Sequence, residues 1–122
     1  MENENLLAIA REFGSPVYVY DSAKINSQYN RLTNAFKQVK RLKLNYAVKA
    51  LSNLAILKLI NSFGAGLDTV SIQEVKLGIK AGVKPSDIVF TPNGVSLEEI
   101  EEVSALGVEE QRVKLIKTIF LF

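Results

Sequence analysis

Two residues of this sequence can do chemistry together, an amine and a carboxylate. Lys49 closes the apolar run LNYAVK, and Asp68 lies within the run GAGLDTVS. A neutral lysine amine condenses with a carbonyl carbon to form a Schiff base, which few other side chains do. Because desolvation disfavours the ammonium form, a partly buried Lys49 predicts a carbonyl substrate or the aldehyde cofactor pyridoxal phosphate.

The residues before Lys49 are expected to place it at the end of a buried strand. Residues 42–50 alternate between an apolar face and a mixed face. The mixed face carries Lys43, Asn45, Ala47 and Lys49. Proteins with α/β folds bind ligands at the carboxyl ends of their strands. The small Ala47 is expected to leave room there for a flat ligand.

A strand–helix unit recurs three times and is expected to bring Asp68 close to Lys49. The expected strands and helices are, in chain order, 42–50, 52–64, 65–71, 71–82, 86–93 and 96–107. The strand starts recur about every 22–23 residues, which is typical of βαβ units with parallel strands. We therefore expect an α/β fold, either the opening of a (β/α)8 barrel or half of a doubly wound sheet.

Asp68 and Lys49 admit two interpretations on spacing alone. Neighbouring parallel strands lie about 4.8 Å apart, so the carboxylate near the second strand's end would stand beside the amine. Such a pair suits a ligand site. It also suits a structural ion pair. On spacing alone the structural interpretation is the favoured one, since most lysines at strand ends are merely solvated.

Composition excludes several other kinds of site. The sequence has no Cys and no His, which removes disulfides, thiol nucleophiles, Cys/His zinc sites and Ser-His-Asp triads. The net charge of +2, with scattered basic residues, predicts neither a nucleic acid nor a membrane partner. No apolar run approaches the roughly 20 residues of a membrane span, and the N-terminal residues lack the pattern of a signal peptide. We expect a cytoplasmic protein.

The remaining motifs predict no further site. The glycines of GAGLD precede a strand rather than join a strand to a helix, so they do not form a dinucleotide fingerprint. The glutamates of SLEEIEEV fit a solvated helix face, with metal binding as the less favoured alternative. Ser71 with Glu74 and Ser96 with Glu99 have the spacing of a capping box. A structural role is therefore expected for Glu74 in preference to a catalytic one.

The two ends of the chain lie outside the repeat. Apolar spacing predicts a helix over 6–13 that Gly14 ends, PVYVYD predicts a strand over 16–21, and Asp21 is expected to cap a following helix. At the other end, EEQRVKLIKTIFLF breaks the repeat where a fourth strand is due. We divide the chain into 1–21, an N-terminal helix and leading strand; 22–107, the strand–helix repeat; and 108–122, an aberrant or truncated tail.

Three stretches together resemble a known family. YAVKA with SNLAILKLI, followed by GAGLDTVSIQEVKLGIKAGVKPSDIVFTPNG, resembles the N-terminal part of the diaminopimelate decarboxylases. These belong to the pyridoxal-phosphate-dependent decarboxylases with an alanine-racemase-like TIM barrel. SPVYVYD is similar to the segment that leads into that barrel. The resemblance covers roughly Phe13 to Gly107 and implies the first three βα units of the barrel, so that 22–107 is a partial pyridoxal-phosphate-binding (β/α) barrel.

The resemblance also implies residue roles and a reaction. The family's cofactor lysine corresponds to Lys49, as the catalytic and cofactor-binding residue, and its acidic residue beside the cofactor corresponds to Asp68. The implied cofactor is pyridoxal 5'-phosphate, with no metal. The intact family decarboxylates meso-diaminopimelate, an amino acid, to L-lysine and carbon dioxide in lysine biosynthesis, and is homodimeric. Leu51 stands where many members have asparagine, which bears on subfamily.

The chain also lacks parts that the family has. The family's cofactor-stacking histidine and its interface cysteine have no counterpart, because neither residue type occurs here. Its phosphate-binding loops and C-terminal β-domain are not matched. We therefore expect an inactive N-terminal piece of the enzyme. The alternatives are a decarboxylase of the ornithine, arginine or carboxynorspermidine type, or a non-enzymatic remnant that serves as an interaction module, which the missing histidine favours.

Overall fold

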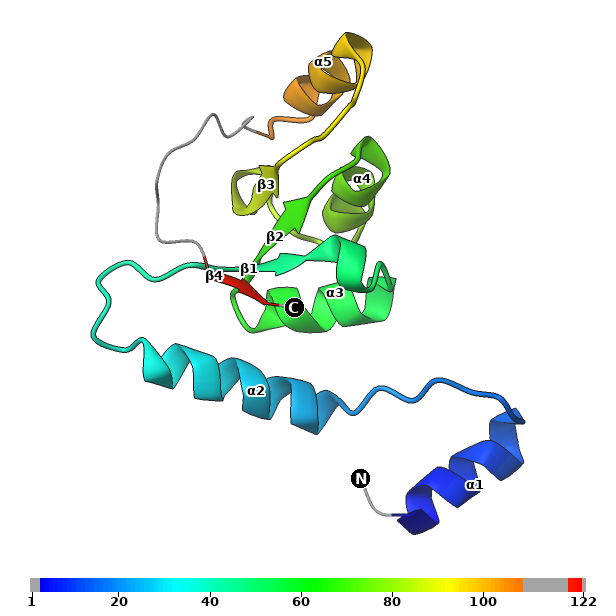
Figure 1. Ribbon diagram of the computed structural model, residues 1–122. Helices are drawn as coiled ribbons and strands as arrows, with labels where there is room; N and C mark the ends of the chain where they lie inside the picture. Colours follow the sequence, from blue (N-terminus) through cyan, green and yellow to red (C-terminus); the bar gives the residue numbers. More distant parts are fainter. Residues whose placement is uncertain (1–2, 109–118, 122) are drawn as a thin grey trace. The chain divides into compact units, whose positions relative to one another are not determined.

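The computed structural model describes residues 3–108 and 119–121, and the chain divides into two compact units, Met1–Ala35 and Phe36–Phe122. The first unit holds helices α1 (Asn3–Phe13) and α2 (Ser22–Ala35) (Figure 1). The helix predicted over 6–13 is thus confirmed. It ends at Gly14, whose backbone has φ 85°.

The strand predicted over 16–21 is wrong. Residues 17–21 form no strand, and Tyr18 is 89% exposed. Alternating β-branched and aromatic residues form a strand only when another strand pairs with their backbone. None of the four strands formed by the described residues pairs with this segment.

Asp21 caps the start of α2, as the sequence predicts. The N–H of Lys24 donates to Asp21 Oδ1 at 3.0 Å. This hydrogen bond is the main reason that the pKa of the Asp21 carboxyl lies below its usual value. No residue of α2 is fully buried.

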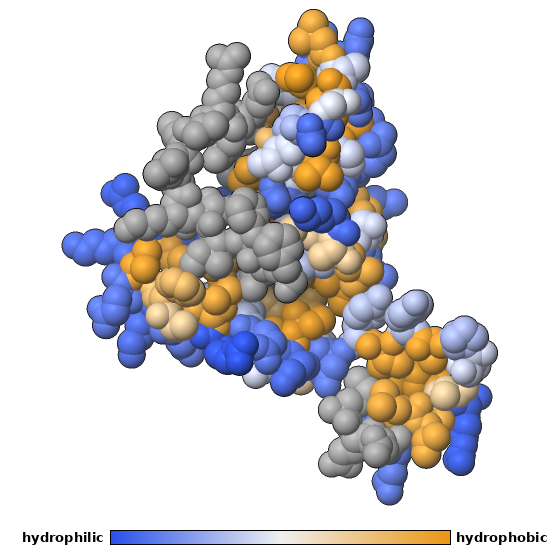
Figure 2. Space-filling model, viewed as in Figure 1, coloured by the Kyte–Doolittle hydropathy of each residue, from blue (hydrophilic) through white to orange (hydrophobic). Residues whose placement is uncertain are grey.

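Large apolar side chains are exposed mainly on the first unit. Figure 2 shows an apolar patch there. The large apolar and aromatic side chains that this unit exposes lie on α1 and in the segment that follows: Leu6, Leu7, Phe13, Val17, Tyr18 and Tyr20.

The second unit is a parallel sheet in the order β3-β2-β1-β4. Its strands are β1 (Leu44–Ala47), β2 (Gly66–Thr69), β3 (Ile88–Phe90) and β4 (Ile119–Leu121). Ala47 pairs with Asp68, and Asp68 pairs with Val89. The parallel order expected for the three repeats is confirmed.

Helices α3 (Leu54–Ser62), α4 (Ile72–Lys80) and α5 (Leu97–Ala105) alternate with the first three strands and gather on one side of the sheet (Figure 1). Leu57, Val75 and Val103 from these helices join Leu67 and Phe90 in one buried core. One βαβαβ half of a doubly wound sheet likewise carries its helices on one face, because its crossovers share the same hand. The arrangement therefore fits both expected folds, the first three units of a (β/α)8 barrel and half of a doubly wound sheet.

Local signals define the helix ends. Asn53 Oδ1 caps α3 by accepting from the N–H groups of Ala55 and Ile56. Each of the three repeats closes on a glycine in the left-handed region, Gly64 at φ 88°, Gly82 at φ 90° and Gly107 at φ 77°. Residues with a Cβ rarely adopt this conformation, which explains why glycine recurs at the end of every repeat.

Only part of the expected tail can be described. β4 pairs in parallel with β1, on the edge opposite to β2. Residues 109–118 and 122 lie outside the described residues. The division into 1–21, 22–107 and 108–122 stays a prediction. In the part of the chain that is described, no helix has the length and apolar character that crossing a membrane requires.

Candidate active site

Lys49 lies just past the carboxyl end of β1. The strand stops at Ala47, and residues Val48–Ala50 form a 3-10 helical turn that the N–H of Leu51 closes by donating to the Val48 carbonyl at 3.1 Å. Val48 is buried, whereas Lys49 is exposed. The strand is thus shorter than the sequence predicts, and the expected partial burial of Lys49 is wrong. The turn carries Lys49 past the last paired residue of the strand.

Asp68 lies on the neighbouring strand and is 7% exposed. Its partner in the ladder is Ala47, so Lys49 lies two residues beyond the position opposite Asp68, within the 3-10 segment. The predicted adjacency of the two strand ends is confirmed by this register. The chemical roles of Lys49 and Asp68 stay predictions.

Thr91 joins this end of the sheet from the third strand. Its hydroxyl donates to Asp68 Oδ1 at 2.8 Å, and its N–H donates to the Thr69 carbonyl at 2.9 Å. Sequence reasoning did not identify Thr91. The alternation of side chains along residues 87–91 could have identified it. This alternation puts Val89 and Thr91 on one face of the sheet, and Asp68 of β2 lies on the same face because it pairs with Val89.

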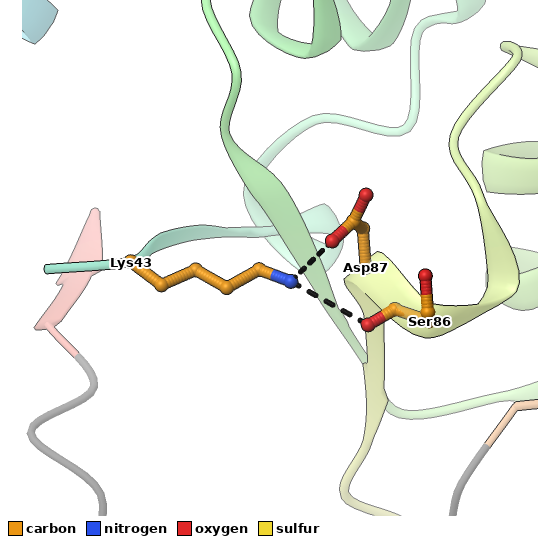
Figure 3. Close-up of polar contacts among 3 residues, drawn as sticks. All are labelled: Lys43, Ser86 and Asp87. Atoms are coloured by element: carbon orange, nitrogen blue, oxygen red, sulfur yellow. Dashed lines mark hydrogen bonds and ion pairs between the residues drawn. The ribbon is translucent and has the colours of Figure 1, made fainter. Parts of the chain in front are cut away.

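Lys43, the other lysine of residues 42–50, forms an ion pair at the opposite end of the strands. Lys43 Nζ lies 2.5 Å from Asp87 Oδ1 and 3.5 Å from the Ser86 carbonyl (Figure 3). Both side chains of the ion pair are 42% exposed, so its contribution to stability is at most about 1 kcal/mol. This contact ties the start of β1 to the turn before β3.

Gly66 lets these groups approach each other across β2. A Cβ at Gly66 would meet Asn45 Oδ1, the carbonyl oxygen of Asp87 and Lys43 Cε. Asn45 Oδ1 is itself buried, and no described residue donates a hydrogen bond to it. The amino ends of β1, β2 and β3 therefore pack without spare room.

Ala47 is fully buried. The expectation that its small side chain leaves room beside Lys49 for a flat ligand stays a prediction. A cavity of about 490 Å³ lies elsewhere, between β3 and α5, and its lining includes Phe90, Ile100 and Val103. Neither Lys49 nor Asp68 lines that cavity.

The capping glutamates have structural partners. Ser96 and Glu99 form a reciprocal capping box at α5. At α4, Ser71 Oγ accepts from the Glu74 N–H, while Glu74 Oε2 accepts from the N–H of Val70 at 2.8 Å. The Glu74 carboxylate thus accepts a hydrogen bond from the N–H of Val70, just after β2, rather than from the N–H of the cap residue Ser71. Among the described residues, no group of three or more acidic, His or Cys side chains could hold a metal ion.

The residues present fit one part of a pyridoxal phosphate molecule. Its aldehyde requires a reachable amine, and its polar ring requires a fixed polar partner. Lys49 is exposed at a strand end, and Asp68 is a buried carboxylate held by a hydroxyl donor on the next strand. These residues can bind the aldehyde and orient an adjacent polar edge.

Comparison with known proteins identifies related sequences and structures. The profile of a family described as pyridoxal-dependent decarboxylase, pyridoxal binding domain, matches residues 22–119. A diaminopimelate decarboxylase of Helicobacter pylori is 41% identical over 85% of this chain and 25% of the relative. The structure of diaminopimelate decarboxylase from Helicobacter pylori complexed with L-lysine superimposes with a TM-score of 0.76, at 39% identity, over 88% of this chain and 26% of that chain.

A more distant structure has the same arrangement. The lysine/ornithine decarboxylase of Vibrio vulnificus, complexed with putrescine, gives a TM-score of 0.78 at 27% identity over 86% of this chain and 28% of that chain. These neighbours confirm a partial TIM barrel of the alanine-racemase-like kind. The family match begins later than the resemblance in the sequence, at residue 22 rather than Phe13, and continues beyond Gly107 to residue 119. The chain spans about a quarter of the length of the curated relatives that it matches.

Proposed function

Because the chain belongs to the pyridoxal-dependent decarboxylases, through their pyridoxal-binding domain, we propose that it forms the part of an amino-acid decarboxylase in which Lys49 anchors pyridoxal 5'-phosphate. The proposed reaction of the whole enzyme is decarboxylation of meso-diaminopimelate to L-lysine. The names of the relatives that match most of this chain support that substrate. For these residues alone we propose cofactor anchoring without turnover.

One observation carries the proposal. The register that pairs Ala47 with Asp68 puts an amine and a carboxylate at the carboxyl ends of adjacent parallel strands. Ligands of α/β folds bind at such ends. The other lysine of the same segment, Lys43, lies at the amino ends of the strands, away from this edge, and is therefore not the preferred anchor.

The proposed roles divide between Lys49 and Asp68. When bound, pyridoxal phosphate supplies a sink for the electrons left on the substrate carbon after carbon dioxide departs. Lys49 Nζ would hold the cofactor through its aldehyde carbon, and the same nitrogen could hold or deliver a proton at the substrate carbon. The Asp68 carboxylate accepts hydrogen bonds and orients whatever group lies beside Lys49.

A second substrate class remains a candidate. The likeness to a lysine/ornithine decarboxylase favours a basic amino acid without the second carboxylate as the alternative substrate. Both substrates need the same amine at position 49. Comparing meso-diaminopimelate with ornithine as substrates of the whole enzyme distinguishes them.

We also propose the setting in which the enzyme works. A decarboxylase of amino-acid biosynthesis is expected in the cytoplasm, with a small amino acid as substrate and no nucleic acid partner, and the resemblance implies a homodimer of the whole enzyme. The weak net charge of +2 supports the absence of a nucleic acid partner. Sedimentation of the whole enzyme measures the dimer.

Borohydride trapping tests the anchoring role. The chain is incubated with pyridoxal phosphate and reduced, and the labelled lysine is located by peptide mass spectrometry. We expect label to concentrate at Lys49, to disappear from that peptide in Lys49→Ala and to persist in Lys58→Ala, which removes another exposed lysine. Label spread evenly over the surface lysines contradicts the proposal.

A further inference from the structure

The carboxylate of Asp68 is held from one direction. Among the residues that the structure describes, Thr91 is the side chain recorded as donating to it, through Oγ1 to Oδ1 at 2.8 Å. A hydroxyl bond to an ionised carboxylate is about twice as strong as a neutral one. The contact therefore restrains the side-chain rotation of Asp68.

Thr91 is itself fixed to the strand that carries Asp68. Its backbone N–H donates to the Thr69 carbonyl at 2.9 Å, which extends the β2–β3 ladder past Phe90. The same carbonyl lies 3.4 Å from Thr91 Oγ1, farther than the carboxylate oxygen. The single hydroxyl proton of Thr91 therefore goes to Asp68, because that acceptor is both closer and charged.

The location of Thr91 suits a positioning role better than a role in stability. Thr91 is exposed, and it follows β3 at the same carboxyl edge where Lys49 follows β1. Its neighbour in the sheet, Thr69, is fully buried and donates its hydroxyl to the Val89 carbonyl at 2.9 Å. One threonine hydroxyl thus serves a site residue, and the other serves the backbone of the sheet.

We propose that Thr91 is a positioning residue of the cofactor site. Its hydroxyl occupies Asp68 Oδ1 and fixes the plane of the carboxylate, so that the other oxygen, Oδ2, is presented to the ligand bound at Lys49. This inference rests on the proposed function of Lys49 and Asp68. With Thr91, the proposed site includes a residue that follows β3, whereas the sequence predicts site residues only on the first two strands.

Two measurements on the full chain test the role of Thr91. The first is the rotamer of Asp68, read from the Hα–Hβ coupling constants by NMR without cofactor. The second is the concentration of pyridoxal phosphate that gives half-maximal borohydride-trapped label at Lys49. The variants are Thr91→Val, which removes the hydroxyl at constant shape, Thr91→Ser, which keeps it, and Thr69→Val as the matched control in β2.

We expect Asp68 to hold one rotamer in the wild type and in Thr91→Ser, and to average over several in Thr91→Val. Half-maximal labelling of Thr91→Val should need about three- to tenfold more pyridoxal phosphate, which corresponds to the net contribution of one ordinary hydrogen bond. Thr91→Ser should restore the wild-type value, and Thr69→Val should leave the Asp68 rotamer unchanged.

Three results overturn the inference: an averaged Asp68 rotamer in the wild type, an unchanged rotamer in Thr91→Val, or an equal loss of labelling in Thr69→Val and Thr91→Val. Failure of the proposed function has a different signature. In that case label shows no preference for Lys49 in any variant, while the coupling constants still decide whether Thr91 fixes Asp68.

Discussion

Gly66→Ala should be the most disruptive single-methyl addition at the sheet's amino end. The new Cβ would meet the backbone carbonyl of Asp87 and the buried Oδ1 of Asn45, together with Lys43 Cε. Lysine Cε belongs to a flexible chain and can move. The carbonyl oxygen is fixed by the 3-10 turn Pro85–Asp87 and cannot move without shifting the start of β3.

The size of the effect follows from overpacking. Forcing a methyl group into a filled site costs about 1–3 kcal/mol, and the upper part of that range applies where the obstacle is backbone. Each kcal/mol lowers the melting temperature by about 4–8 °C for a domain of 60–100 residues. We therefore expect Gly66→Ala to lower the melting temperature by at least about 10 °C.

Gly78→Ala is the matched control. A Cβ there would lie 2.6 Å from Leu67 Cδ1 and 3.3 Å from Ile88 Cδ1, which are the ends of flexible side chains. Gly78 lies inside α4, where alanine is favoured over glycine by about 1 kcal/mol. This gain offsets much of the crowding, so the control should be near neutral.

Chemical denaturation followed by circular dichroism gives the free energy of unfolding of both variants. The reasoning requires Gly66→Ala to be clearly less stable than Gly78→Ala. Equal stability of the two variants, or a wild-type value for Gly66→Ala, would show that the three strand starts have room to relax.

Two further outcomes concern charge. The pKa of Asp21 is lowered mainly because the Lys24 N–H donates to its carboxylate, so the capping contribution to α2 is present above the ordinary pKa of 3.8 and is lost as pH falls through the lower folded-state value. The helical circular dichroism signal should therefore fall in that acid range in the wild type but not in Asp21→Asn. Identical acid profiles of the two proteins would refute this role of Asp21. Lys43→Met should lower the free energy of unfolding by less than about 1 kcal/mol, because both side chains of its ion pair with Asp87 are 42% exposed. A urea titration that gives a loss above about 2 kcal/mol would show that the pair is shielded from solvent.

Local signals in the sequence predicted the repeat well. Asn53, Ser71 and Ser96 begin the three helices that follow the strands, and a glycine closes each one. These signals act over a few residues, so they can be read without knowing the fold. The order of the parallel strands then followed from the constraint that parallel neighbours need a crossover.

Contacts between distant residues were not predictable in the same way. Thr91 meets Asp68, and Lys43 meets Asp87, only because the register of β2 against its two neighbours brings them together. Register depends on side-chain packing across the whole sheet. The exposure of Lys49 was missed for a related reason, since the period of two gives no sign that β1 turns into a 3-10 helix after Ala47.

The pairing of β4 with β1 has a consequence for the order in which the sheet assembles. Leu44 pairs with Ile119, whereas its neighbour Asn45 pairs with Gly66, so the first contact closes a much longer stretch of chain. From these separations, the entropy of loop closure disfavours the β1–β4 contact by about 1 kcal/mol relative to β1–β2. The ladder between β1 and β4 should therefore form after the three repeats have docked and should open first. In native-state hydrogen exchange, the amides that bond across β1 and β4 would exchange through local opening, well before those between β1 and β2.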